Sequence, residues 1–303
     1  RRAKSGIKQL VIPGMIYENM GITYLGPVDG HNIEEMVRVF KDASKVDGPV
    51  MVHCLTQKGR GYLPAERHPA RFHGAEPFDI ETGLPSNKKE KAAYTDIFST
   101  VMRKLGDRNE NVVAITAAME TGTGLKRFHN MFPERFFDVG IAEETAVALA
   151  SGIAANGGKP VYGVYTSFVQ RTYDQLSQDL CINNNPATII TFWGTVYGMN
   201  DVTHLGLYDI PMMANIPNLV YLAPTTKEEY LAMLDWSVEQ NSYPVAIKVP
   251  GGELISDGKT VTKDFGKLNT YEVIQKGSKI AVIGLGAFLS LIHISEPTRL
   301  QLI

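Results

Sequence analysis

Three side chains at intervals of three residues have the types needed to bind a charged or aromatic ligand. Tyr165 ends the strand-like run PVYGVY, and Phe168 and Arg171 follow it. On a helix these three side chains would share one face. Open α/β sheets bind ligands at the carboxyl ends of their strands, so this face is a candidate binding surface. Arg171 offers a planar donor fork to a carboxylate or a phosphate. The alternatives are core packing for Phe168 and an ion pair between Arg171 and Asp174.

A pair of glutamates lies where a strand is followed by a helix. Glu143 and Glu144 come after the strand-like run FFDVGI and begin an Ala-rich helical stretch. A buried carboxyl group in such a place can give or take a proton in catalysis. The alternative, which the pair taken alone favours, is that both carboxylates only complement the positive end of the helix dipole. Asp138, inside the predicted strand, is expected to be structural.

Three further candidates each stand alone. Tyr62 lies in the Gly-rich, basic stretch KGRGY, His73 ends the dipeptide FH, and His204 lies in NDVTHLG. A solvated basic turn is the alternative for Tyr62, and a lone histidine is more often structural than functional. His53 and Cys54 are adjacent on a predicted strand, where their side chains point to opposite faces. They are therefore poor joint metal ligands, and no metal ligand is assigned in this chain.

The elements that must position these residues alternate between strands and helices. The strand-like runs cover residues 49–55, 111–116, 160–165, 187–193, 218–224, 244–249 and 279–286. Helical patterns cover residues 32–44, 142–156 and 226–238, and Asn32 and Thr226 can cap two of them. The runs are short, rich in Val and Ile and without regular alternation, which is typical of strands buried on both faces of a parallel sheet. The predicted fold class is α/β, with parallel sheets flanked by helices.

Composition and charge exclude several classes of protein. The 303 residues carry 30 basic and 32 acidic side chains, a net charge of −2, so no nucleic-acid partner is expected. The longest apolar stretch, residues 280–294, is interrupted by Gly, Ser and His and is shorter than the roughly 20 residues of a membrane span; no membrane association is expected. Two cysteines, Cys54 and Cys181, cannot form a disulfide framework, which indicates a cytoplasmic protein.

Two polar stretches, residues 74–91 and 251–267, divide the chain into predicted segments 1–88, 89–252 and 253–303. The chain lacks an initiator Met and is expected to begin within a longer gene. Its tail from about residue 289, LSLIHISEPTR, resembles the translation of a sequencing adapter. That tail is therefore expected to be artefactual and is excluded from the fold.

Six motifs in one order resemble those of the 1-deoxy-D-xylulose-5-phosphate synthase family, transketolase-like enzymes that depend on thiamine diphosphate. They are GPVDGH, KGRGYLPAE, FH, FPERFFDVGIAEE, YTSFVQRTYDQ and THLG. The resemblance implies a transketolase-like thiamine-diphosphate-binding fold, Mg²⁺ as a second cofactor, and a homodimer when full length. It implies that residues 1–88 are the C-terminal part of the diphosphate-binding domain plus a linker. Residues 89–252 would be the pyrimidine-binding domain, and residues 253–303 the truncated start of a C-terminal domain.

The resemblance also implies a role for seven side chains. Glu143 would contact N1′ of the aminopyrimidine ring and activate the cofactor, so that the 4′-nitrogen can take the proton from thiazolium C2. Tyr62 and Phe168 would hold the cofactor in place. The side chains that would meet substrates are His73, Tyr165, Arg171 and His204. The implied reaction decarboxylates pyruvate and joins the remaining two carbons to glyceraldehyde 3-phosphate. Its product, 1-deoxy-D-xylulose 5-phosphate, would serve isoprenoid and thiamine synthesis.

The chain departs from the family's pattern at three places. The GDG motif and its asparagine, which hold diphosphate and Mg²⁺ in the family, are expected upstream of residue 1. In the acceptor region, Asn200 stands where the family has an aspartate. The family's YPRG is replaced by Val249–Gly252, so an arginine expected to bind the acceptor's phosphate is missing. Lys248 is expected to compensate in part. The third departure follows Glu143, where Glu144 and Thr145 stand in place of the family's usual Gln-His.

These departures leave two alternatives open. The chain can come from a transketolase-like paralogue that uses a different aldehyde acceptor. It can also be an inert fragment of such an enzyme, because a cofactor site without its phosphate cradle binds weakly or not at all. Under both alternatives, the 303-residue chain by itself is expected to be inactive.

Overall fold

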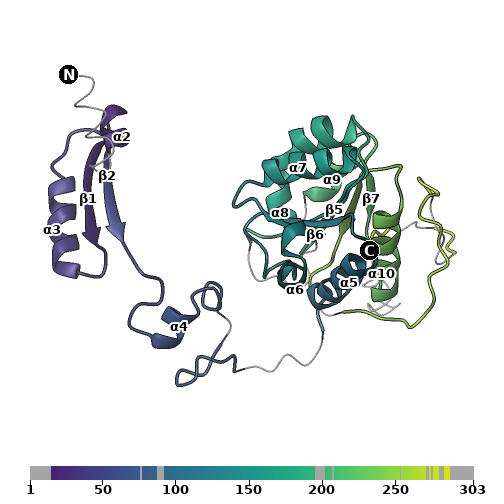
Figure 1. Ribbon diagram of the computed structural model, residues 1–303, viewed down its shortest axis with the longest axis horizontal. Coiled ribbons are helices and arrows are strands. Elements are labelled where there is room, and N and C mark those ends of the chain that lie inside the picture. The colour runs from purple at the N-terminus through teal and green to yellow at the C-terminus, as the bar shows by residue number, and fades with distance from the viewer. Residues whose placement is uncertain are drawn as a thin grey trace. The chain divides into compact units, whose positions relative to one another are not determined.

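The computed structural model divides the chain into two compact units, Arg1–Lys89 and Glu90–Ile303 (Figure 1). The structure describes residues 15–75, 77–86, 92–194, 202–206, 208–252, 254–270, 273, 276–279 and 283–286. In the predicted strand 279–286, the described residues 279 and 283–286 are not in a strand, and residues 280–282 lie outside the described residues, as does the whole tail from residue 289. In the described part of the chain, no helix has the length and hydropathy that a membrane crossing requires.

The first unit contains, in its described part, a parallel sheet of two strands. Its elements are α2 (Met15–Asn19), β1 (Thr23–Asp29), α3 (Ile33–Ala43), β2 (Val50–Leu55) and α4 (Leu63–Arg67). The strands pair with Thr23 opposite Val50 and Asp29 opposite Leu55. The Asn32 side chain accepts the backbone N–H of Glu35 at 3.1 Å and caps α3, as the sequence predicts.

The described part of the second unit contains one sheet of six parallel strands, in the order β4-β3-β5-β6-β8-β7. The strands are β3 (Val112–Thr116), β4 (Phe136–Asp138), β5 (Lys159–Tyr165), β6 (Thr188–Phe192), β7 (Val220–Leu222) and β8 (Val245–Lys248). The longer helices are α5 (Tyr94–Arg108), α7 (Glu143–Ala155) and α10 (Lys227–Glu239). The shorter ones are α6 (Lys126–Met131), η1 (Pro133–Arg135), α8 (Thr166–Val169), η2 (Gln170–Thr172), the π-helix η3 (Gln175–Cys181) and α9 (Asp209–Ala214). Strands paired in parallel and joined by helices confirm the α/β class.

The predicted helices in this unit begin and end close to where the sequence indicates. Thr226 caps α10 by accepting the N–H of Glu229 at 3.2 Å. Helix α7 ends before Gly157, whose φ of +83° is a left-handed conformation that glycine adopts without strain. Helix α5 was not predicted from the sequence; it begins where the Asp96 carboxylate accepts the backbone N–H of Ala93.

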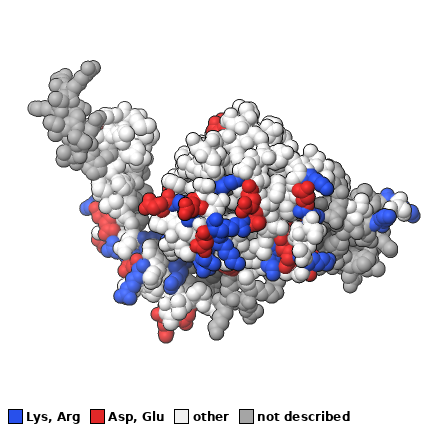
Figure 2. Space-filling view, turned by 45° about the vertical axis from the view of Figure 1, so that its right-hand side comes forward, with Lys and Arg blue, Asp and Glu red and all other residues white. Residues whose placement is uncertain are grey.

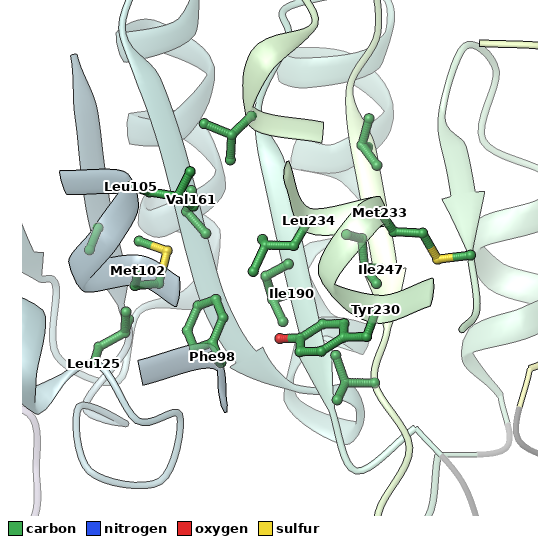
Figure 3. Packing of buried hydrophobic residues seen from close by; sticks show 14 of the residues in the cluster. Phe98, Met102, Leu105, Leu125, Val161, Ile190, Tyr230, Met233, Leu234 and Ile247 are labelled. Carbon is green, nitrogen blue, oxygen red and sulfur yellow. The ribbon is translucent and has the colours of Figure 1, made fainter. Parts of the chain in front are cut away.

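Two hydrophobic clusters cover the opposite faces of the six-stranded sheet. Neighbouring residues of β3, such as Ala114 and Ile115, belong to different clusters, as the alternation of side chains along a strand requires. The first cluster packs α5, α6 and α10 on one face, and the second packs α7, η3 and α9 on the other. Figure 3 shows part of the first, in which Phe98 and Tyr230 approach Ile190.

Charged side chains of both signs are intermixed on the face shown in Figure 2. Between α5 and α10, the Arg108 guanidinium donates to Asp235 at 2.5 Å and to Glu239 at 2.7 Å. Residues 254–270 also contact α10, because Lys263 pairs with Glu229 and the Phe265 ring lies 6.0 Å from Trp236. Exposed pairs of this kind contribute little to stability individually, so burial in the two clusters dominates.

The first cluster makes a test of this core possible. Phe98 is fully buried, and its ring lies 5.2 Å from that of Phe192 in an edge-to-face contact. Phe98→Ala is expected to lower the free energy of unfolding by about 3–5 kcal/mol, because it removes apolar contacts and leaves a cavity. Phe137→Ala, at a side chain that is 42% exposed on the edge strand β4, is the matched control.

Urea unfolding followed by tryptophan fluorescence measures this difference in the second unit, since both tryptophans, Trp193 and Trp236, lie there. The control is expected to cost less than about 1 kcal/mol. Equal losses in the two variants would contradict the placement of Phe98 in the core.

Candidate active site

Glu143 is the first residue of α7, and it is only 3% exposed. A buried carboxylate needs hydrogen-bond donors or an opposite charge. Nη1 of Arg171, in η2, lies 3.1 Å from Oε2 of Glu143, and the Arg171 side chain is 53% exposed. The α7 dipole also favours a negative charge at this end of the helix. The structure thus pairs Arg171 with Glu143, whereas the sequence left a pair with Asp174 open.

A buried hydroxyl lies on the same face of the sheet. Tyr162, in β5, belongs to the cluster that α7 covers, and its hydroxyl has no hydrogen-bond partner among the described residues. Burial raises the pKa of Tyr162, and the negative charges of Glu143 and Glu144 raise it further. Tyr162 therefore stays protonated at neutral pH. Tyr162 was not a predicted site residue, because nothing in the run PVYGVY shows which strand residues face α7.

Four rings form an aromatic cluster, defined as Tyr165, Phe168, Trp193 and His204. The centroids of Tyr165 and Phe168 lie 5.6 Å apart with the ring planes 26° apart. His204 approaches Phe168 edge-on at 5.3 Å and Tyr165 at 6.4 Å. Trp193 also lies 6.4 Å from Tyr165. These half-buried rings follow the carboxyl ends of β5 and β6, where a parallel sheet is suited to bind a planar ligand.

Tyr165, Phe168 and Arg171 do not share one helix, as the spacing suggested. Tyr165 ends β5, Phe168 lies in α8 and Arg171 lies in η2. The chain thus changes from strand to α-helix and then to a 3₁₀ turn within seven residues. This path lets Phe168 stack on Tyr165 while Arg171 reaches Glu143.

Tyr62 and His73 lie in the first unit. The Tyr62 hydroxyl donates to the carbonyl of Ile80 at 2.8 Å, and its ring contacts Phe72 and Phe78. Nδ1 of His73 lies 2.7 Å from Nζ of Lys58. The other five predicted site residues lie in the second unit and are brought together there, Glu143 with Arg171 and the other three in the aromatic cluster.

Two further expectations concern the acceptor region. Asn200 lies outside the described residues. Lys248 is 4% exposed, and its ammonium group bonds to Asp209 and to the carbonyl of Gly206. The expectation that Lys248 compensates for a missing phosphate-binding arginine is therefore not supported, because the side chain faces oxygens of the protein itself.

Asp138 acts structurally, since its Oδ1 accepts the backbone N–H groups of Ala118 and Gly140.

Comparison with known proteins assigns the second unit. The family described as transketolase, pyrimidine binding domain, matches residues 90–255. The chain belongs to this family. The family described as 1-deoxy-D-xylulose-5-phosphate synthase matches residues 1–56.

The chain is similar to curated 1-deoxy-D-xylulose-5-phosphate synthases. It is 44% identical to that of Natranaerobius thermophilus over 288 residues, which cover 94% of this chain and 45% of that protein. It is also 44% identical to that of Clostridium acetobutylicum, over 94% of this chain and 46% of that protein. The chain spans about half the length of the curated relatives it matches. The resemblance seen in the six motifs is thus confirmed.

Solved transketolase structures share the fold. The transketolase from Campylobacter jejuni gives a TM-score of 0.52 at 15% identity, covering 85% of this chain and 51% of that chain. The transketolase from Pichia stipitis, in complex with sedoheptulose 7-phosphate, gives 0.50 at 15% identity, with 84% and 51% covered. At this identity the likeness concerns the fold alone, and it confirms the predicted transketolase-like arrangement.

The chain near His204 approaches β6 too closely for any side chain at Gly206. An added Cβ would lie 2.7 Å from both the Cα of Gly194 and the carbonyl oxygen of Trp193. Gly206→Ala must displace backbone and is expected to lower the free energy of unfolding by about 1–3 kcal/mol. In Gly152→Ala, inside α7, the new Cβ meets no atom within 4 Å, and a gain of about 0.5–1 kcal/mol is expected.

Urea unfolding of the two variants and the unchanged chain measures both effects. Opposite signs are expected. A Gly206→Ala chain as stable as the unchanged one would show that the 202–206 segment does not lie against the end of β6.

Proposed function

We propose that this chain forms the pyrimidine side of a thiamine-diphosphate site in a two-carbon transferase. The reaction decarboxylates pyruvate and joins the remaining two carbons to glyceraldehyde 3-phosphate, giving 1-deoxy-D-xylulose 5-phosphate. The observation that carries the proposal is the buried Glu143 carboxyl group at the start of α7. Support comes from the synthases that are 44% identical to this chain. The activity belongs to the whole protein of which this sequence is about half by comparison with those relatives.

The residues present fit an aminopyrimidine ring. Glu143 offers a carboxyl group shielded from water, and Phe168 offers a half-buried aromatic face in the same unit. When bound, thiamine diphosphate supplies the electron sink for decarboxylation. Glu143 would share a proton with N1′ of the ring, and the low exposure of its carboxyl group would keep water from competing for that hydrogen bond. Phe168 and Tyr62 would fix the position of the cofactor.

The remaining candidates would meet the substrates. Arg171 is half exposed and can exchange the Glu143 carboxylate for the carboxylate of pyruvate. His204 can hydrogen-bond the oxygen on which charge develops. Tyr165 would border the same space, because its ring contacts both Phe168 and His204. His73 would contribute from the first unit.

The organisation of the whole protein is part of the same proposal. Residues 1–88 would complete a diphosphate-binding domain, residues 89–252 form the pyrimidine-binding domain, and residues 253–303 begin a third domain. The family match over residues 90–255 and the division of the chain after Lys89 support these limits. By resemblance to the family, Mg²⁺ would be held together with the diphosphate, by residues expected upstream of residue 1. A homodimer in the cytoplasm completes the proposal.

Turnover of a Glu143 variant tests the function. In the longest polypeptide encoded by the reading frame that contains this chain, Glu143→Ala is expected to lower kcat by about 10²–10⁴-fold, because the proton shared with the cofactor is lost. Release of CO₂ from pyruvate, with glyceraldehyde 3-phosphate, thiamine diphosphate and Mg²⁺ present, measures it. Glu144→Ala, one residue along α7, is the control and is expected to keep its turnover.

Thermal unfolding must show that both variants fold. Retained turnover in folded Glu143→Ala would remove this residue from the mechanism. The absence of turnover in the unchanged polypeptide would remove the proposed reaction itself.

One observation favours a second candidate, a related transferase with a different acceptor. Val249–Gly252 supplies no arginine, and Lys248 is buried against Asp209, so neither offers a cation to an acceptor's phosphate. A panel of phosphorylated and unphosphorylated aldehydes, each incubated with pyruvate and the same polypeptide, separates the two candidates. Glyceraldehyde 3-phosphate is expected to give the highest kcat/KM. A preference for an unphosphorylated aldehyde would favour the second candidate.

A further inference from the structure

A buried polar cluster lies beside the candidate site and is formed by residues of β7, the end of β8 and the start of α9. It consists of Lys248, Asp209 and Tyr221. The Lys248 side chain is 3% exposed and that of Asp209 is fully buried. The Lys248 ammonium group and the Tyr221 hydroxyl both donate to the same carboxylate oxygen, Oδ2 of Asp209.

The cluster is poorly built for stability alone. Removing two charges from water costs more than a pair of this kind usually returns, and apolar replacements of both partners are often neutral or stabilising. The second oxygen of Asp209, Oδ1, is buried and has no hydrogen-bond partner among the described residues. Burial lowers the pKa of Lys248, and Asp209 opposes this shift. A role in positioning accounts for such a cluster better than a role in stability.

What the cluster holds is the backbone at Gly206. Nζ of Lys248 donates to the carbonyl oxygen of Gly206 at 3.1 Å. Gly206 also lies directly against Gly194 and Trp193, at the end of β6. The chain is therefore fixed at Gly206 from two sides, by the lysine at the end of β8 and by the backbone that follows β6.

This fixed point lies two residues after His204. The His204 ring approaches Phe168 at 5.3 Å, and its Nδ1 lies 2.8 Å from the Thr203 hydroxyl. Two residues of backbone allow little freedom between the fixed carbonyl and the imidazole. The position of Gly206 thus limits how far His204 can move away from the aromatic cluster.

We propose that Lys248, with Asp209 and Tyr221 behind it, is a positioning residue that holds His204 against the aromatic cluster. Its consequence for catalysis rests on the proposed function. The positioning itself is a property of the chain without cofactor or substrate. It can therefore be tested separately from the reaction.

The decisive variant is Lys248→Met combined with Asp209→Leu. It removes both charges together, so no unpaired charge is left buried, and it removes the hydrogen bond to Gly206. Lys248→Arg, which keeps a charged donor, is the conservative variant. Lys159→Met is the matched control, since Lys159 begins β5 and donates to the Gln240 carbonyl at 2.7 Å, at the opposite end of the sheet.

The measurement is the nuclear Overhauser effect between ring protons of His204 and Phe168 in the 303-residue chain, with His204 assigned by a His204→Gln sample. In the double variant this effect is expected to fall at least about threefold while the thermal midpoint stays at or above that of the unchanged chain. Lys159→Met is expected to keep the full effect. Lys248→Arg, which still offers a charged donor, is expected to keep most of it. An unchanged effect in the folded double variant would overturn the proposal.

Tyr221→Phe provides a second test. It keeps the ion pair between Lys248 and Asp209 and removes only the hydrogen bond from the Tyr221 hydroxyl to Asp209. A partial loss of the His204–Phe168 effect is expected. If the double variant does not fold, an unchanged effect in Tyr221→Phe overturns the proposal. Since no cofactor or substrate is present, this failure would be distinct from a failure of the Glu143 turnover test.

Discussion

Parallel pairing of all six strands is the constraint on which the candidate site depends. Parallel strands end at the same edge of a sheet, so Tyr165 at the end of β5, Trp193 after β6 and Lys248 at the end of β8 come to one edge although they are distant in sequence. The short connection after β4 also places Glu143 there, at the start of α7. An antiparallel pairing anywhere in the centre of this sheet would send one of these groups to the opposite edge.

The polar groups at this edge are held in different ways. Glu143 is buried, but its partner Arg171 reaches solvent and can exchange it for another anion. Asp209 and Lys248 are both buried and have no such freedom. The exchangeable pair thus suits ligand binding and proton sharing, whereas the closed pair suits the holding of backbone. In the order of the sheet, Tyr165 at the end of β5 and Trp193 after β6 lie between these two pairs, and their half-buried rings offer apolar surface.

The strand runs were predictable because they are short, rich in Val and Ile and bounded by Gly, Pro or Asn, as in NVVAIT and PVAIKV. Strand β1 could not be predicted in this way, because Gly26 and Pro27 interrupt its sequence. Glycine and proline in the interior of a strand remove the pattern that identifies it. The motif residues of the site could be named by resemblance, but their partners could not. Arg171 meets Glu143 across 28 residues, and Lys248 meets Asp209 across 39. Such pairs depend on the order of strands in the sheet, which periodicity does not contain.

In the proposed function, the Glu143 carboxyl group activates a thiamine ring by sharing a proton with it. The rate of hydrogen–deuterium exchange at C2 of thiamine diphosphate tests this role. The cofactor is bound to the longest polypeptide encoded by the reading frame that contains this chain. Proton NMR after rapid quenching follows the exchange. Glu143→Gln is expected to slow this exchange by about 10²-fold or more, and Glu144→Gln is expected to leave it unchanged. Exchange at the unchanged rate in Glu143→Gln, with the cofactor bound, would contradict this role of Glu143.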